Sequence, residues 1–428
     1  MNMKTLIKHG YIIDPASGLE GKYDILIENG RISEIRENLR TTASVVIEAE
    51  NCYVMPGFID LHTHLRDPGF TEKETLTTGS EAAAAGGFTT ICAMPNTKPV
   101  MDTPEKLLEL QRRAMDEAIV NVIQLGAITM GQQGRELADI EGMAKAGCPA
   151  VSEDGKSVMD EKLYEKAMRI AAANRIGIFA HCEDINLVKG GVMNKDSVSE
   201  RMGLPGISNE VEDRIVERDI GLAERTGAKL HLCHCSTEKS VDLIRQAKSR
   251  GVRVTAEVCP HHFTLTTEDI PGDDANYKMN PPIRTKLDVE ALKEGLKEGV
   301  IDAIATDHAP HTAKEKSGSM RTAPFGIVGL ETALGLAMTE LVEPGVLTPS
   351  QLASRMSLTP ARILGIDRGS LEIGKIADIV IFDPKFEYTI RAEATCSRGK
   401  NSPFIGRKVR GRVMNTLVAG RIVYRSQW

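Results

Sequence analysis

Two histidines stand at the end of a short apolar run near the start of the chain, residues 58–64 (FIDLHTH). Successive side chains of a strand point to opposite faces, so His62 and His64 lie on one face, about 7 Å apart along the chain. That spacing allows two imidazoles to bind one metal ion, although a His-x-His pair alone is a weak signal. Arg66 follows two residues later and adds a cation beside the predicted site.

Further candidate metal ligands come after other apolar runs. His181, His234 and Asp307 each stand at the end of such a run, and Asp154 follows another. Imidazole and carboxylate groups suit zinc and similar divalent ions, and a ligand set without thiolate favours a catalytic site over a structural one. Six protein ligands are more than one tetrahedral ion needs, and they suit two ions that share a carboxylate and a hydroxide. Two dications, two carboxylates and one hydroxide leave a charge of about +1, which favours an anionic substrate.

The runs that carry these residues alternate with amphipathic helical stretches. We predict strands at residues 54–62, 89–93, 121–125, 150–152, 177–181, 229–233, 253–258 and 303–306. Eight strands that alternate with helices over roughly 310 residues predict a (β/α)8 TIM-like barrel, whose active site lies at the carboxyl ends of the strands. A doubly wound open sheet is the alternative, but no Gly-x-Gly-x-x-Gly motif follows the first strand.

The two ends of the chain have a different pattern. Residues 1–56 contain short alternating runs and an Asn29-Gly30 hairpin signal, and short runs punctuated by glycine return in residues 366–428. Either end alone would bury little apolar surface, so we predict that both ends pair into one small β-sandwich domain. The expected division is therefore 1–56 and 366–428 for the small β domain, and 57–365 for a metal-dependent catalytic barrel.

Composition narrows the function classes. Charged residues make up 26% and hydrophobic residues 41% of the 428 residues, as in ordinary globular proteins. The net charge of -6 and the absence of a basic cluster argue against nucleic-acid binding. No apolar stretch reaches the ~18 residues of a membrane span, and no signal-peptide core follows Met1. The eight cysteines form no Cys-x-x-Cys pair and fit buried free thiols, so we expect a cytoplasmic protein in a reducing compartment.

With these residues laid out, the chain resembles the dihydroorotases of the amidohydrolase superfamily, of the longer bacterial type, over essentially its whole length. The resemblance rests on residues 60–69 (DLHTHLRDPG), 93–97 (AMPNT), 180–183 (AHCE), 234–237 (HCST), 280–282 (NPP), 305–311 (ATDHAPH) and 324–326 (PFG). Members of that family are zinc-dependent cyclic amidohydrolases. They interconvert (S)-dihydroorotate and N-carbamoyl-L-aspartate in de novo pyrimidine biosynthesis.

The resemblance also implies roles for individual residues. Two zinc ions per subunit would be bridged by Asp154 and a hydroxide, the first bound by His62, His64 and Asp307 and the second by His181 and His234. Asp307 would be the general acid/base. Substrate contacts would come from His64, Arg66, Asn96, Asn280, His311, Phe325 and Gly326. The resemblance further implies a homodimer and allows an association with aspartate transcarbamoylase.

Alternatives remain open at this stage. Hydantoinases and allantoinases share the fold, but they bridge their metals with a carboxylated lysine and lack the His-x-His-x-Arg carboxylate binder. Gly155 predicts a turn that moves Lys156 out of register with Asp154. A non-catalytic subunit that scaffolds a transcarbamoylase would have lost metal ligands, whereas all six are present here. Residues 311–323 are either a plain surface loop or a lid, and we expect His231 to face away from the site.

Overall fold

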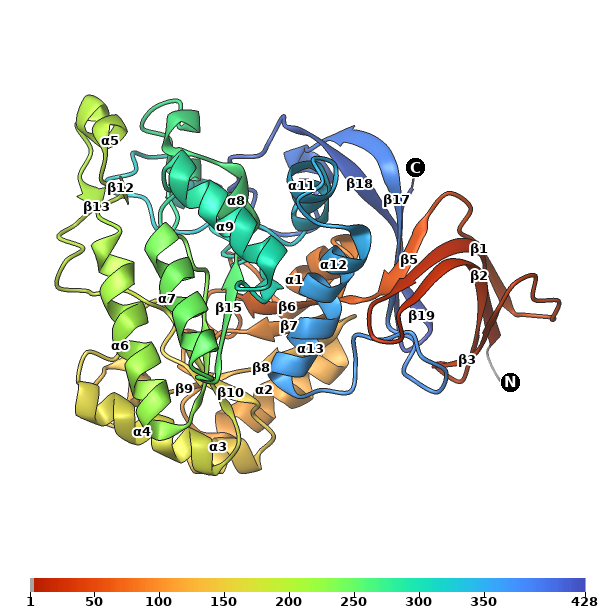
Figure 1. Cartoon of the computed structure of the whole chain (residues 1–428), viewed down its shortest axis with the longest axis horizontal. Helices are drawn as coiled ribbons and strands as arrows, with labels where there is room; N and C mark the ends of the chain where they lie inside the picture. The colour runs from red at the N-terminus through yellow and green to blue at the C-terminus, as the bar shows by residue number, and fades with distance from the viewer. Residues whose placement is uncertain (1–3, 428) are drawn as a thin grey trace.

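Short parallel strands form a barrel at the centre of the molecule, and amphipathic helices surround it (Figure 1). The computed structural model describes residues 4–427. One run of strands has the order β6-β7-β8 and the other the order β16-β15-β14-β11-β10-β9. A parallel bridge between Thr63 and His308 joins the first run to the segment after β16 and closes the wall. The predicted (β/α)8 barrel is confirmed.

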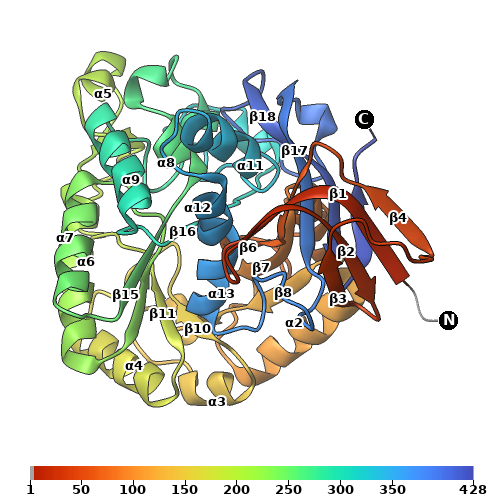
Figure 2. The same ribbon diagram turned by 45° about the vertical axis from the view of Figure 1, so that its right-hand side comes forward.

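Each barrel strand is short, as expected for a wall that is buried on both faces. The barrel strands are β6 (Phe58–Thr63), β7 (Phe88–Ala93), β8 (Asn121–Gln124), β9 (Gly126–Ala127), β10 (Ala150–Ser152), β11 (Gly177–Ala180), β14 (Lys229–Leu232), β15 (Val254–Val258) and β16 (Ala303–Ile304). β8 pairs with β7 and the directly following β9 pairs with β10, so these two segments together fill one of the eight positions. The longer helices are α1 (Leu76–Ala85), α2 (Pro104–Glu117), α4 (Glu161–Ala173), α6 (Glu210–Thr226), α7 (Glu238–Ser249) and α9 (Lys286–Glu298). Figure 2 shows α4, α6 and α7 outside the wall that contains β10, β11 and β15.

Helix α2 illustrates why these segments are helical. Leu107, Leu110 and Ala114 are its buried residues, and they recur at the three- and four-residue spacing of one helix face. Thr103 caps the first turn by accepting a hydrogen bond from the Lys106 N–H. Pro104 takes the first helical position, where its missing N–H costs nothing. Burial of each leucine contributes about 1.5–3 kcal/mol, which fixes this face against the barrel.

Both ends of the chain meet in one further sheet of order β19-β18-β17-β5-β1-β2-β3, with β4 paired to β1. Its strands are β1 (Lys4–Asp14), β2 (Leu19–Glu28), β3 (Arg31–Arg36), β4 (Val45–Glu48), β5 (Tyr53–Pro56), β17 (Ile379–Thr389), β18 (Lys408–Val418) and β19 (Arg421–Arg425). A separate buried cluster supports it, including Ile7, Ile25, Val54, Ile379 and Leu417. In Figure 1 the red strands β1 and β2 and the blue β17 and β18 lie on the right of the barrel. The predicted small β-sandwich domain from both ends is confirmed.

The prediction of one strand over residues 54–62 is wrong, because the structure divides this run in two. β5 pairs with β17 in the small domain, whereas β6 pairs with β7 in the barrel. Gly57 separates the two strands, and a Cβ atom there would lie 2.2 Å from the Thr89 side chain. The backbone can therefore pass this close to β7 only because residue 57 has no side chain.

Shorter elements connect these layers. They are α3 (Ile140–Lys145), β12 (Met193–Asn194), α5 (Ser197–Met202), β13 (Gly206–Ile207), α8 (Pro260–Thr264), α10 (Ala313–Lys316), α11 (Ala333–Ala337), α12 (Pro349–Ala353) and α13 (Thr359–Leu364). Among residues 4–427, no helix combines the length and the apolar character that crossing a bilayer requires.

Candidate metal centre

The six predicted metal ligands meet at the carboxyl ends of the barrel strands. They stand at the end of β6 or just after it (His62, His64), and after β10 (Asp154), β11 (His181), β14 (His234) and β16 (Asp307). All six are buried, with at most 7% of any one exposed. The structure therefore brings together residues from five separate strands at one mouth.

Asp154 lies at the centre of this group. Its Oδ1 is 3.2 Å from His62 Nε2 and 3.7 Å from His181 Nδ1. The same oxygen is 3.9 Å from His234 Nε2, and Oδ2 is 3.4 Å from His64 Nε2. One carboxylate thus faces all four imidazoles, which is the position that a ligand shared by two ions requires.

Asp307 completes the group on the side of the first two histidines. Its Oδ1 is 3.0 Å from His64 Nε2 and 3.5 Å from His62 Nε2. Burial alone would raise the pKa of Asp307, but the hydrogen bond from His64 and the charge of His62 lower this pKa below its ordinary value. The pKa of Asp154 is likewise lowered, because the charges of the facing imidazoles, that of His62 above all, outweigh burial. Both carboxylates are therefore ionised, as metal-binding carboxylates are.

Several buried atoms of this group lack a hydrogen-bond partner. His62 Nε2 and Asp154 Oδ1 face each other without a bond, and His234 Nδ1 is also unpartnered. Almost all buried polar atoms in proteins have a partner, so such a cluster needs an explanation. Ligand atoms of His62, Asp154 and His234 lie within 4.8 Å of one another, as do those of His62, His64 and Asp307. The unpartnered atoms and the imidazole–carboxylate chemistry fit a divalent metal cofactor.

Three of the imidazoles are held by hydrogen bonds on the nitrogen that faces away from Asp154 or Asp307. His62 Nδ1 is 2.9 Å from Glu257 Oε1. His64 Nδ1 is 3.0 Å from Asn96 Oδ1. His181 Nε2 is 3.0 Å from Glu183 Oε2. Such outer hydrogen bonds fix the tautomer and the ring orientation of a metal-binding histidine.

The backbone is strained at three residues of the site. Arg66, His234 and Asp307 have φ angles of 60°, 34° and 47°, in the left-handed region that side chains other than glycine rarely adopt. Strain of this kind costs on the order of 1–3 kcal/mol per residue and is retained where the surrounding structure holds a functional geometry. These three positions are therefore held by the fold rather than by local preference.

Comparison with known proteins agrees with this geometry. The profile described as "Amidohydrolase family" matches residues 53–423. The chain belongs to the amidohydrolase family. It is 49% identical to a dihydroorotase of Pelotomaculum thermopropionicum over 98% of each chain. It is 48% identical to a dihydroorotase of Citrifermentans bemidjiense over 99% of this chain and 100% of the relative. The resemblance to the dihydroorotases is confirmed.

Solved structures with a similar fold include hydantoinases. The L-hydantoinase of Arthrobacter aurescens superposes with a TM-score of 0.87 at 27% identity, covering 99% of this chain and 96% of that one. A structure described as D-hydantoinase also has a TM-score of 0.87, at 26% identity, with 99% and 95% covered. Both similarities support the barrel and the small domain of this amidohydrolase.

The predicted substrate contacts of this amidohydrolase gather beside the metal ligands. Arg66 Nη2 is 3.3 Å from His311 Nε2, and Arg66 Nε donates to the Pro310 carbonyl. His311 Nε2 is 2.8 Å from the Phe325 carbonyl. Burial and the charges of Arg66 and Lys73 lower the pKa of His311 to about 3, so the ring is neutral and donates to Phe325. A cation and a neutral imidazole thus stand together at the mouth.

The two predicted asparagines lie against carboxylates of the site. Asn96 Nδ2 donates to Asp154 Oδ2 at 3.1 Å, while its Oδ1 faces His64. Asn280 lies near Glu183, which holds His181, and helps to lower the pKa of that carboxyl. Both therefore contact the ligands or their supports, in addition to the substrate contacts predicted for them.

Lys156 points away from the metal ligands. Gly155 has a φ of +80°, which turns the chain directly after Asp154. The Lys156 Nζ then donates to the Gln132 carbonyl at 3.1 Å. This placement agrees with the predicted turn and leaves Asp154 as the anion among the histidines.

The segment that follows His311 is tied down at several points. Lys278 Nζ donates to the carbonyls of Met320 and Ala323, both at 2.6 Å. Lys316 Nζ donates to the Gly326 carbonyl at 2.8 Å. Burial lowers the pKa of Lys316 to about 7. In this structure residues 311–326 are therefore an ordered part of the mouth.

Asn401, in the connection between β17 and β18, holds the same loop from the other side. Its Nδ2 donates to the carbonyls of Ala309 and Gly326 at 3.1 and 3.0 Å. Its Oδ1 accepts from the His311 N–H at 3.0 Å. One buried amide thus fixes three backbone groups of the loop that carries His311 and Gly326.

Replacing Asn401 with alanine is expected to lower kcat/KM about tenfold or more without changing metal content. The substitution leaves three buried backbone groups without a partner, each at a cost of about 1–3 kcal/mol, so the loop shifts. Glu393→Ala, an exposed change in the same connection, is the matched control. Unchanged kcat/KM, or loss of metal in the Asn401 variant, would contradict this role.

Several residues of the site were missed by sequence reasoning. Glu257 is a fully buried carboxylate inside the apolar run of β15, and that acid among apolar residues was the available signal. The expectation that His231 faces away from the site is wrong. His231 Nε2 is 2.9 Å from Glu257 Oε2, so it points into the barrel and supports the carboxylate that holds His62. The alternation of side chains along β14 did not by itself show which face of this strand points into the barrel.

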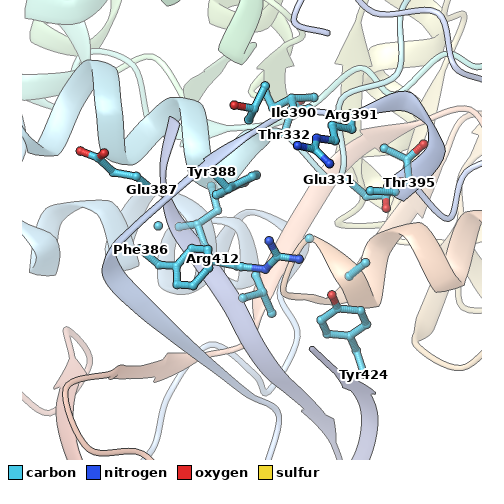
Figure 3. A pocket seen from close by; sticks show the side chains of 17 residues that line it. Glu331, Thr332, Phe386, Glu387, Tyr388, Ile390, Arg391, Thr395, Arg412 and Tyr424 are labelled. Carbon is cyan, nitrogen blue, oxygen red and sulfur yellow. The ribbon is translucent and has the colours of Figure 1, made fainter. Parts of the chain in front are cut away.

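A cavity of about 290 Å³ lies elsewhere, between the β17–β18 hairpin and the start of α11 (Figure 3). Phe386, Tyr388 and Tyr424 line it, and the Arg412 guanidinium lies 5.4 and 5.3 Å from the first two ring centres. Burial raises the pKa of its Glu331 to about 7. None of the six metal ligands lines this cavity, so it is separate from the metal centre.

Proposed function

We propose that this chain is a cytoplasmic dihydroorotase, which interconverts (S)-dihydroorotate and N-carbamoyl-L-aspartate with the help of two zinc ions. The observation that carries the proposal is Asp154 placed between four imidazoles, with Arg66 and His311 at the same mouth. Near full-length identity of 49% to a dihydroorotase supports the substrate assignment.

We assign the ligands as follows: His62, His64 and Asp307 to one zinc ion, His181 and His234 to the other, and Asp154 to both. When bound, the ions supply acidified water, whose pKa falls from 15.7 to about 7, and Lewis acidity toward the ring carbonyl. The remaining steps are carried by side chains of this chain.

Arg66 binds the substrate carboxylate through paired N–H groups, which suits the planar guanidinium. His311 contacts the same end of the substrate, and Asn96, Asn280 and the backbone of Phe325 and Gly326 complete its orientation. Asp307, ionised before the reaction, accepts a proton from the attacking water and passes it to the ring nitrogen that leaves. In the reverse direction Asp307 removes that proton from the carbamoyl nitrogen.

The direct test combines a metal analysis with a dihydroorotate hydrolysis assay of the purified protein. We expect about two zinc equivalents per chain, loss of activity on chelation and its return with zinc. Ring closure consumes a proton, so the final ratio of the two compounds should shift about tenfold toward the ring for each unit fall in pH. An endpoint independent of pH would rule out this reaction.

Arg66→Ala is expected to lower kcat/KM for dihydroorotate at least about thirtyfold while both metal ions stay bound. Losing a buried charge-assisted pair costs roughly 2–5 kcal/mol, and the lower value corresponds to this factor. Dihydrouracil, the same ring without the carboxylate, provides the internal comparison, because its slow hydrolysis should change little. Equal losses with both rings would show that Arg66 acts on the fold and not on the carboxylate. This comparison also separates the proposal from a hydantoinase activity.

The proposal includes assembly into a homodimer, on the basis of the family resemblance. Light scattering after size-exclusion chromatography should give twice the mass of the chain. Adding aspartate transcarbamoylase in the same experiment tests the proposed association, which would appear as a larger complex containing both proteins.

A further inference from the structure

A cavity of about 300 Å³ opens at the end of the barrel opposite to the metal centre. The first residues of β11, β14 and β15 line it, whereas the metal ligands follow the last residues of these strands. Helix α13 forms its remaining wall and packs into the same end of the barrel, where Ala361 and Leu364 share a buried cluster with Phe179. The cavity is therefore a separate feature, which the proposed reaction does not use.

Positive charge surrounds this cavity. Lys229, Arg253 and Arg362 line it, and Arg175 lines an adjoining cavity of about 240 Å³ together with Lys229 and Arg253. All four side chains are exposed. Within residues 4–427, none of the four has a carboxylate oxygen within 4.0 Å, although the chain as a whole has a net charge of -6.

The few bonds that these cations make leave most of their donors available. Lys229 Nζ donates to the Arg175 carbonyl at 3.2 Å, and Arg253 Nη1 donates to the Gly227 carbonyl at 3.3 Å. The Arg362 guanidinium has no hydrogen-bond or ion-pair partner among the residues that the structure describes. Like charges gathered without an acid repel one another, and an anion among them would relieve this repulsion.

The interior of the cavity has a different character. Phe179, Leu230, Val254 and Ile363 contribute apolar surface, and the rings of Phe179 and His231 lie 4.5 Å apart between centres. Both ring nitrogens of His231 are already engaged, by Thr255 and Glu257. His231 and Phe179 are only 2% and 1% exposed, so their packed rings form the floor of the cavity. His231 has no free N–H, so any polar recognition must come from the cations at the rim.

We propose that this cavity is a second ligand site, which binds a small molecule with a flat apolar body and a phosphate monoester head. The body would lie against Val252 and Ile363, above the buried rings of Phe179 and His231, and the head among Lys229, Arg253 and Arg362. A phosphate monoester carries close to two negative charges and three acceptor oxygens, which several cations match better than one carboxylate does. Dihydroorotate, with a single carboxylate, is a poorer match.

The probe for this site is 1-naphthyl phosphate, titrated into the zinc-loaded protein and followed by calorimetry. 1-Naphthol supplies the body alone and inorganic phosphate the head alone. We expect the complete probe to bind at least about tenfold more tightly than either part, because each half of the cavity contributes. If 1-naphthol or inorganic phosphate bound as tightly as 1-naphthyl phosphate, the proposal would be overturned.

Variants locate the binding. The double variant Arg253→Gln, Arg362→Gln should bind 1-naphthyl phosphate at least about tenfold more weakly than the wild type. Arg201→Ala, which changes an exposed arginine elsewhere, should leave this affinity unchanged. Both changed residues are exposed, so the fold and the dihydroorotate turnover should be unaffected. Arg362→Glu, a single charge reversal, should weaken the probe as well.

Phosphate esters can also bind at a metal centre, so a competition experiment is needed. A saturating concentration of N-carbamoyl-L-aspartate should leave the affinity for 1-naphthyl phosphate unchanged. Displacement by that compound, or unchanged affinity in the double variant, would place the probe elsewhere and overturn the proposal. Probe binding is measured by calorimetry and the proposed function by dihydroorotate turnover. A protein without turnover would therefore still test the second site.

Discussion

Replacing Asp154 with alanine is expected to remove at least one of the two metal ions and to abolish turnover, whereas Lys156→Ala keeps both ions and most of the activity. Asp154 Oδ1 is 3.2–3.9 Å from nitrogens of three histidines, and its Oδ2 is 3.4 Å from the fourth. Without this carboxylate, one negative charge fewer would lie between the two dications, so their mutual repulsion would weaken the binding of both. Lys156 is turned toward the Gln132 carbonyl and contributes no such anion.

Metal content is the decisive measurement for this pair of variants. Each protein is stripped with a chelator, reconstituted with zinc and analysed by elemental analysis after gel filtration. Wild type and Lys156→Ala should recover about two ions per chain in buffer free of bicarbonate, because an aspartate is ionised at neutral pH and needs no carbon dioxide. A bicarbonate requirement, or metal loss in the lysine variant, would assign the bridge to a carboxylated lysine instead.

The metal ligands could be predicted from sequence because each one lies at the end of a recognisable strand or within a few residues after it. In a parallel barrel the ends of the strands meet at one face, so residues at those ends converge whatever the lengths of the intervening loops. His62, Asp154 and Asp307 are examples, although the first and the last are 245 positions apart in the chain. The barrel itself followed from the alternation of strands and helices, which is a repeated and therefore robust signal.

The support around the ligands could not be predicted in this way. Glu257 and His62 are 195 residues apart, and Asn401 and Ala309 are 92 apart. These contacts depend on how side chains pack inside the barrel or across from the small domain, which periodicity does not report. The division at Gly57 escaped detection for a similar reason. Apolar residues continue through β5 and β6, and only the close approach of Thr89 shows that the chain changes sheets there.

The left-handed conformations of Arg66, His234 and Asp307 belong to the same class of feature. Sequence preferences predict such φ angles for glycine or asparagine and not for these residues. Tertiary contacts impose them: Asp60, for example, accepts hydrogen bonds from the N–H groups of His62 and Thr306 and so ties β6 to the segment that carries Asp307. The strained positions are therefore a consequence of the assembled site and could be seen only in the structure.

Asp307→Asn is expected to reduce kcat by about 10²–10⁴ at saturating zinc, the range that a positioned general acid/base contributes. The amide keeps the shape of the carboxylate and an oxygen that can face His64, so loss of rate is not simply loss of the side chain. An amide cannot accept the proton of the attacking water, and both reaction directions need that step. Because a catalyst cannot change the equilibrium ratio, kcat/KM for hydrolysis and for ring closure should fall by the same factor at a given pH. Metal content measured on the same samples separates proton transfer from ion binding. A variant that holds two ions and turns over within tenfold of the wild-type rate would show that another residue is the acid/base. His311, whose Nε2 lies beside the Phe325 carbonyl and Arg66, would be the next candidate.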